Sequence, residues 1–370
     1  MMENHKGIGY KERKHNRLYT IEFFRVWFIL IIILGHALVL YPPNKKAVYQ
    51  FFFNSSAEQY WFGVELFCII GGFFLYRRIA AGVSPLELVK KTYYRLMCPL
   101  MFAFILSVFV SNIHWSGFIR VISLVGGTGL FYPAAGWGEW FNGAYFWGAC
   151  LLIGLFGKSH KQGFFSLGII MFVTLCLKLH LPKSQDNSCD TYYMLCGVRF
   201  LRIIYSLGFG FIASYIVTHI QIPSRWYTCI CLTVFEIYAL YSVNNFLARP
   251  EISNHSYYEM EVLFSLLLIS LSQSQSVISY IFNKFGFIQK ISRYMFPMLM
   301  GQIVMMNLMQ THNAFGLDYI TGISTIMVGS FVLGVIEYHL VERTLVPIID
   351  KYLTTPKKAD DNTITAYGNK

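Results

Sequence analysis

Long apolar stretches alternate with short polar breaks along the whole chain. A helix needs about 20 mostly apolar residues to cross the roughly 30 Å hydrocarbon core of a bilayer. The fold class expected is therefore all-α: a polytopic membrane helical bundle with about ten transmembrane helices, over residues 20–41, 60–76, 95–113, 141–157, 163–181, 199–219, 226–243, 260–276, 294–312 and 319–341. Residues 115–140, rich in Gly and Trp, leave open a re-entrant or interfacial segment before the fourth helix.

Composition supports this prediction. Hydrophobic residues make up 55% of the 370 residues and charged residues only 13%, whereas a soluble domain usually carries about a quarter charged residues. The formal charge of +11 lies between the apolar spans, not in one basic arm, which argues against nucleic acid as a partner. The first apolar run is too long for a cleavable signal peptide and lacks a small-residue cleavage site. No zinc-like cysteine spacing is present, so no metal is expected.

The distribution of basic residues predicts the orientation. With the amino terminus inside, 21 Lys and Arg fall in inner segments and seven in outer ones, as the positive-inside rule requires. We expect a cytoplasmic basic N-terminus (1–19), a transmembrane domain (20–341) and a cytoplasmic tail (342–370) in the cell inner (plasma) membrane. A disulfide between Cys189 and Cys196 is left open.

The first span carries three residues that are costly inside a bilayer, Glu22, Arg25 and His36. At 100° per residue, Arg25 lies about 60° from Glu22 on the helical wheel and His36 falls between them, so the three form one polar stripe. An interfacial ion pair explains Glu22 and Arg25 without function. A neighbouring carbonyl would satisfy His36, but this is the one histidine expected well inside an apolar span.

Glu65, in the second span, is expected at the same depth as His36. The two spans run in opposite directions, and each residue lies about five positions from the outer end of its span. A carboxylate that holds a histidine in one tautomer is a recurring device in acyl transfer. The alternative is a Glu that faces a water-filled cavity.

The loop after the second span is strongly basic, with Arg77, Arg78, Lys91 and Arg95. These residues serve equally well as a positive-inside anchor or as a site for a phosphate-bearing ligand. For the further intramembrane polar residues, structural hydrogen bonds between helices are the expected role: Glu236, Gln302, Arg199 and Arg202.

Together these segments resemble the acyltransferase family 3 membrane proteins, which O-acylate sugars and surface glycans. The resemblance rests on the first helix, on Val64-Glu65-Leu66-Phe67 with Gly72-Phe73, on a basic-to-proline stretch, on the entry to a late helix and on a closing Glu-Arg motif, in residues 17–36, 64–73, 95–99, 291–297 and 338–343. The matches span nearly the whole chain in order, though each is loose.

The resemblance implies an O-acetyltransferase that uses cytoplasmic acyl-CoA, most commonly acetyl-CoA, as a co-substrate and has no permanently bound cofactor. The acceptor would be a carbohydrate hydroxyl of a cell-surface or lipid-linked glycan. By carry-over, His36 is the catalytic histidine, Glu22 and Arg25 support it, and Arg95 belongs to the donor-binding motif. The basic loop residues Arg77, Arg78 and Lys91 would hold the donor's phosphates with it.

Three positions depart from the family pattern. Thr92 stands where an Arg is frequent, Gly71 where a Ser is usual, and Gln302 where many members have a late His. Altered donor binding or an altered acceptor would follow from these changes. The main rival is a multi-pass transporter or flippase of glycan precursors, although the paired Gly/Pro interruptions of many transporter repeats are not evident. The sequence does not indicate the oligomeric state.

Overall fold

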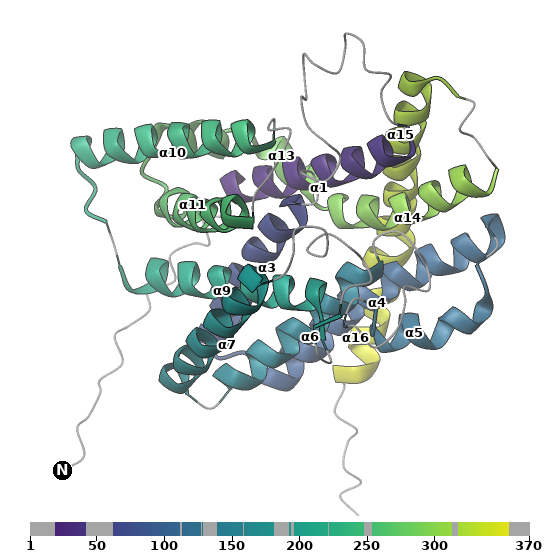
Figure 1. Ribbon diagram of the computed structural model, residues 1–370, viewed down its shortest axis with the longest axis horizontal. Helices are drawn as coiled ribbons and strands as arrows, with labels where there is room; N and C mark the ends of the chain where they lie inside the picture. Colours follow the sequence, from purple (N-terminus) through teal and green to yellow (C-terminus); the bar gives the residue numbers. More distant parts are fainter. Residues whose placement is uncertain are drawn as a thin grey trace, which may run out of the picture.

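The computed structural model is a bundle of helices (Figure 1). It describes residues 19–41, 62–111, 113–126, 128, 139–157, 159–180, 192–193, 196–220, 222–247, 254–312 and 317–354. The longer helices are α1 (Tyr19–Leu40), α3 (Phe62–Ala80), α4 (Pro85–Val110), α6 (Glu139–Phe156), α7 (His160–His180), α9 (Val198–His219), α10 (Trp226–Leu247), α11 (Asn254–Gln273), α14 (Met295–Thr311) and α15 (Tyr319–Glu337).

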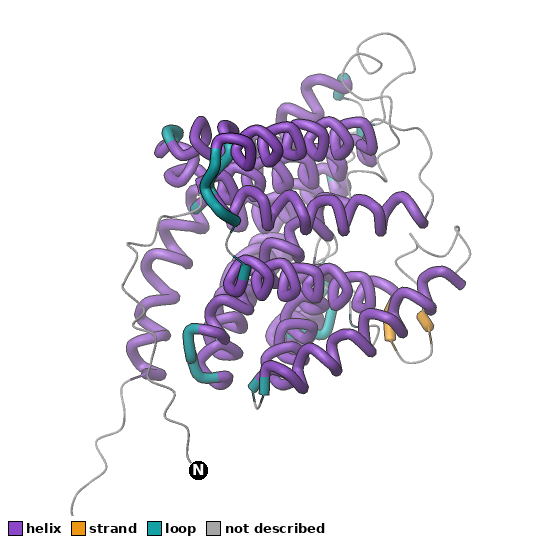
Figure 2. Tube along the Cα trace, turned by 90° about the vertical axis from the view of Figure 1, so that its left-hand side faces the viewer, coloured by secondary structure: helices purple, strands orange, loops and turns teal. Residues whose placement is uncertain are grey.

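Short elements connect and extend these helices. They are η2 (Trp115–Gly117), α5 (Phe118–Ser123), α12 (Val277–Asn283), α13 (Gly286–Ser292), the π-helix η4 (Tyr338–Leu345) and α16 (Val346–Thr354). Among the described residues, strand occurs only as a two-residue antiparallel pair of β1 (Tyr192–Tyr193) and β2 (Cys196–Gly197), visible in Figure 2. The predicted all-α class is confirmed.

Each apolar stretch picked out in the sequence overlaps one of the longer helices, but α4 begins about ten residues earlier than expected. Pro85 occupies its first turn, and the Ser84 side chain accepts a hydrogen bond from the Glu87 backbone N–H. Ser followed three residues later by Glu is a capping-box sequence, and Pro is favoured at the first helical position. Lys91 and Arg95, which the sequence placed in the preceding loop, therefore lie on α4, while Arg77 and Arg78 lie in the last turn of α3.

Six helices among the described residues are long and apolar enough to cross a membrane. A seventh span results if α11 and α12, bent by 68° at their junction, are taken as one. Large apolar side chains project from the surface of these helices, such as Phe109, Phe165 and Trp226, each more than 70% exposed. Exposed apolar surface on this scale fits a lipid environment. The structure thus supports a helical membrane protein, with a count of at most seven such spans.

Helix α3 lies in the middle of the molecule, between α1, α11 and α14 on one side and α6, α7 and α9 on the other (Figure 1). Its most extensive packing is against α9. A Cβ atom at Gly72 would lie 2.2 Å from the Leu207 carbonyl oxygen, and one at Gly210 would lie 2.1 Å from the Ile69 carbonyl oxygen. Glycine at both positions allows the two backbones to touch, as small residues do in membrane helix pairs.

Candidate functional site

A cavity of about 3290 Å³ opens beside the carboxyl end of α3 and the amino ends of α1, α4 and α7. Six of the eight site residues predicted from the sequence line it: Glu22, Arg25, Arg77, Arg78, Lys91 and Arg95. The structure therefore brings the ion pair of the first helix and the basic residues of the second loop to one place.

The cavity is strongly cationic. Its lining contains eight Lys and Arg side chains but only two carboxylates, Glu22 and Glu342. Three of these cations were not predicted as site residues. They are Lys161 on α7, Lys290 on α13 and Arg293 in the turn after α13. Their signal was present in the charge count, which placed them on the same side as the basic loop. Such a surface favours an anionic ligand.

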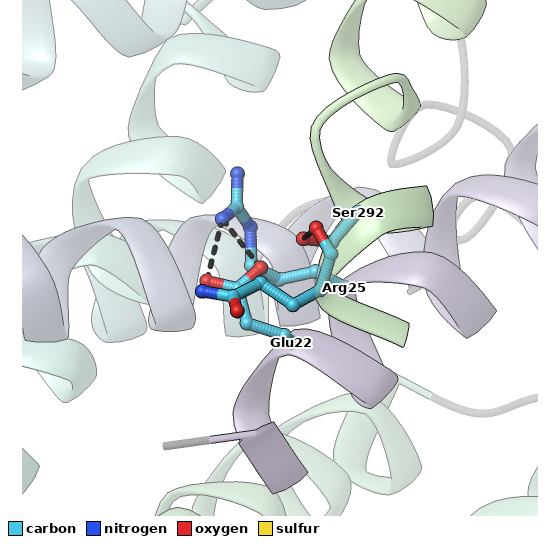
Figure 3. Close-up of polar contacts among 4 residues, drawn as sticks. Glu22, Arg25 and Ser292 are labelled. Carbon is cyan, nitrogen blue, oxygen red and sulfur yellow. Dashed lines mark hydrogen bonds and ion pairs between the residues drawn. The ribbon is translucent and has the colours of Figure 1, made fainter. Parts of the chain in front are cut away.

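The predicted pairing of Glu22 with Arg25 is confirmed. Arg25 Nη1 donates to Glu22 Oε2 at 2.9 Å, and the two side chains are 21% and 16% exposed for Glu and Arg. The Arg25 guanidinium also lies 6.0 Å from the centre of the Phe67 ring on α3. Figure 3 shows Ser292, from α13, beside this pair. The pair is therefore a partly shielded feature of the cavity wall.

The basic residues of α3 and α4 are accessible to a ligand in the cavity. Arg77, Arg78 and Arg95 are exposed to the cavity. Lys91 donates to Glu87 one helical turn earlier, at 2.6 Å, and both side chains are 45% exposed. Such an exposed ion pair contributes about 0–1 kcal/mol, so a phosphate can replace the carboxylate at little cost.

Two positions that depart from the resembled pattern also line the cavity, Thr92 and Gly71. A Cβ atom at Gly71 would lie 2.5 Å from Tyr145 Oη and 2.7 Å from the ring carbon Cε2. The Tyr145 side chain, from α6, thus occupies the space that a serine at position 71 would need. The close approach of Tyr145 therefore explains why position 71 is a glycine. No sequence pattern indicated this contact.

A further wall of the cavity is aromatic and was not singled out in the sequence. Tyr76 of α3, His160 and Phe164 of α7, and Tyr215 and His219 of α9 line it together. The Phe164 and Tyr215 ring centres are 4.5 Å apart. Aromatic residues near helix ends are common in membrane proteins, so the sequence had no signal to separate these five from the rest.

Glu65 has a different partner from the one expected. Its Oε1 accepts a hydrogen bond from Arg202 Nε at 2.7 Å and forms an ion pair with Arg202 Nη2, linking α3 to α9. Its Oε2, also buried, has no hydrogen-bond partner among the described residues. One helical turn beyond Arg202, Ser206 Oγ donates to Glu261 Oε1 of α11 at 2.6 Å. The expectation that Glu65 holds His36 is therefore corrected: an arginine distant in sequence engages this carboxylate.

His36 is buried in the second half of α1, with 9% of its surface exposed. It is not among the residues that line the cavity. Eleven residues separate it from Arg25, a distance of roughly 16 Å along the helix axis. The structure thus places the stripe's charged pair in the cavity and the imidazole farther along the same helix.

Of the other intramembrane polar residues, Glu236 has the structural role expected for it. Ser270 of α11 donates to Glu236 of α10 at 2.7 Å, a hydrogen bond between helices. Gln302 is 2% exposed, and its Nε2 has no hydrogen-bond partner among the described residues. The side chains of Arg199 and Cys196, and the whole of Cys189, lie outside the described part of the chain, so the disulfide stays open.

Comparisons with family models, curated proteins and solved structures found no match to this chain. Within the described ranges, no group of three or more His, Cys, Asp or Glu side chains is placed to hold a metal ion.

Proposed function

We propose that this protein is a membrane-embedded O-acyltransferase that moves an acyl group, acetyl in the simplest case, from acyl-CoA to a carbohydrate hydroxyl. The observation that carries the proposal is the cationic cavity, lined by eight Lys and Arg side chains, at the start of the helix that bears His36. A phosphate-rich thioester donor matches this charge. The family resemblance in the sequence supports the same chemistry, with a cell-surface or lipid-linked glycan as acceptor.

In the proposed reaction His36 acts as general base. It removes the proton of the acceptor hydroxyl, whose oxygen attacks the thioester carbonyl carbon. The new C–O bond forms as the C–S bond breaks, and the departing thiolate takes up the proton. Positioned general-base catalysis supplies about 10²–10⁴ in rate.

The donor has to bridge the separation between its phosphates and the base. Arg77, Arg78, Lys91 and Arg95 hold the phosphates in the proposal, while His36 lies roughly 16 Å beyond Arg25 along α1. The donor's flexible pantetheine arm would extend along the polar stripe of α1 to cover that length. Glu65, which is bonded to Arg202, would act in this proposal by setting the position of α3 beside α9.

The orientation in the proposal follows the bias of basic residues. The cationic cavity and both termini face the cytoplasm, where acyl-CoA is available, and the acceptor enters from the other side of the plasma membrane. A flippase of glycan precursors would also use a polar path through the bundle. It would not consume a thioester, which separates the two functions experimentally.

The test is transfer from radiolabelled acetyl-CoA to candidate glycans by the purified protein in lipid nanodiscs. We expect product with the wild type and a loss of about 10²–10⁴ in rate for His36→Ala. His312→Ala is the matched control, because this exposed histidine lies just after α14, outside the cavity. Retained transfer by His36→Ala would remove the imidazole from the mechanism. Absence of thioester consumption by the wild type with every acceptor would favour the transporter.

A further inference from the structure

The aromatic wall of the cavity, defined by Tyr76, His160, Phe164, Tyr215 and His219, differs in character from the lining that α1 and α4 contribute. Those two helices present charged groups. On the aromatic wall, rings from three helices gather around Tyr215, whose side chain is 38% exposed. A ring cluster open to a cavity is a place where a flat ligand can stack.

Tyr215 and His219 form the part of this wall best suited to stacking. Their ring centres are 4.1 Å apart and their planes are tilted by 35°. His219 Nδ1 lies 2.8 Å from the Tyr215 carbonyl oxygen, and because a carbonyl can only accept, Nδ1 carries the proton. This hydrogen bond fixes the imidazole over the phenol ring. Phe164 packs against Tyr215 at 4.5 Å and supports the pair.

Cationic groups directly adjoin the aromatic wall. Arg77 and Arg78 follow Tyr76 at the end of α3, and Lys161 follows His160 in the first turn of α7. All three line the same cavity. The amino end of a long helix adds partial positive charge to the side chains there. Flat rings beside several cations fit a ligand that is both planar and phosphorylated.

We infer that the Tyr215–His219 pair is the subsite for the purine ring of an anionic nucleotide, with its phosphates held by Arg77, Arg78 and Lys161. The inference rests on the proposed function, because the acyl-CoA donor supplies such a nucleotide at its adenosine end. A phosphate-bearing lipid headgroup would use the cations but gain nothing from the stacked rings. The subsite would direct the other end of the donor toward α1 and His36.

The experiment measures binding of adenosine 3′,5′-bisphosphate to the full-length protein in lipid nanodiscs by calorimetry, at one fixed salt concentration. Replacing the ring in Tyr215→Leu or His219→Leu should weaken binding roughly 5- to 100-fold, the usual effect of losing one base-stacking side chain. Tyr215→Phe keeps the ring and should bind as the wild type does. Tyr238→Leu is the matched control, because this tyrosine on α10 is 61% exposed and lies outside the cavity.

A second probe separates stacking from charge. Inorganic pyrophosphate carries phosphates without a base, so Tyr215→Leu should leave its affinity unchanged, whereas Arg78→Gln should weaken both probes. Thermal unfolding of each variant shows that it is folded. Equal nucleotide affinity in the wild type, Tyr215→Leu and His219→Leu would overturn the inference, as would no nucleotide binding by the wild type.

The binding and transfer experiments together distinguish the nucleotide subsite from the proposed acyl transfer. Nucleotide binding that depends on Tyr215, in a protein that transfers no acyl group, would uphold the subsite and reject acyl transfer. Acyl transfer with a donor affinity that is the same in Tyr215→Leu and the wild type would uphold the proposed function and reject the subsite.

Discussion

At the scale of single residues, Glu65 and Arg202 form the most buried ion pair among the described residues. Glu65 is 2% and Arg202 8% exposed. Burying two charges is costly, and the pair persists because each compensates the other. Their helices, α3 and α9, also make the most extensive helix contact in the molecule, so the pair fixes their relative position.

Removal of one partner should therefore be worse than removal of both. Arg202→Met leaves the Glu65 carboxylate buried and uncompensated, and we expect it to lower the free energy of unfolding by about 3–5 kcal/mol. The double variant Glu65→Leu with Arg202→Met should recover most of that loss. Denaturant titration in detergent micelles measures both. Lys91→Met is the control, since its exposed ion pair with Glu87 contributes about 0–1 kcal/mol.

This account would be wrong if the double variant lost as much free energy of unfolding as Glu65→Leu and Arg202→Met lose in sum. Such additivity would mean that the carboxylate and the guanidinium contribute independently, with no coupling across the interface of α3 and α9.

At the scale of elements, the same interface depends on glycine. Gly72 of α3 and Gly210 of α9 each sit against backbone atoms of the other helix. Because a backbone cannot move aside as a flexible side chain can, any Cβ atom at these positions forces the helices apart. Both the ion pair and the aromatic wall depend on this spacing.

Gly72→Ala and Gly210→Ala should each destabilise the protein by about 1–3 kcal/mol, as overpacking does in a dense interior. Gly168→Ala on α7 is the matched control, because no atom lies within 4 Å of a Cβ atom added there. In that variant alanine's better helix propensity should leave stability unchanged or raise it by up to about 1 kcal/mol. Denaturant titration of the three variants distinguishes close packing from a general effect of replacing glycine. Equal effects at all three positions would refute the interface explanation.

At the scale of the whole molecule, the number of membrane crossings depends on α3, α6 and α14. None of the three is among the helices that are long and apolar enough to span by themselves. Helix α3 carries Glu65, Arg77 and Arg78. Helix α14 has 17 residues, nearly all of them buried within the bundle, and extends about 25 Å. Protein neighbours, rather than lipid, surround α14, so low hydropathy does not forbid a crossing.

Ten crossings predict opposite sides for the two ends of α14. In a cysteine-free background, Lys284→Cys should be accessible to a membrane-impermeant maleimide only after the cells are opened. His312→Cys should react in intact cells. Both positions are exposed in the structure. Labelling of the two cysteines from the same side would show that α14 does not cross and would reduce the count. Arg225→Cys, after α9, should be labelled like Lys284→Cys, because the proposed orientation places both on the cytoplasmic side.

Local features of the chain were predictable from the sequence because they depend on neighbours a few residues away. Runs of apolar residues located the long helices, and the spacing of Glu22 and Arg25 predicted their contact within one turn of α1. The early start of α4 was encoded as well, in Ser84, Pro85 and Glu87. The basic residues gathered at the cavity were visible as a charge bias, although not as a cavity.

Contacts between distant segments were decided by the tertiary structure alone. Glu65 and Arg202 are 137 residues apart, and helical depth by itself matched Glu65 with His36 instead. The aromatic wall combines α3, α7 and α9, whose order in the chain does not specify which helices become neighbours. A helix's own sequence determines which of its faces is polar, but the partner of that face depends on how the whole bundle packs.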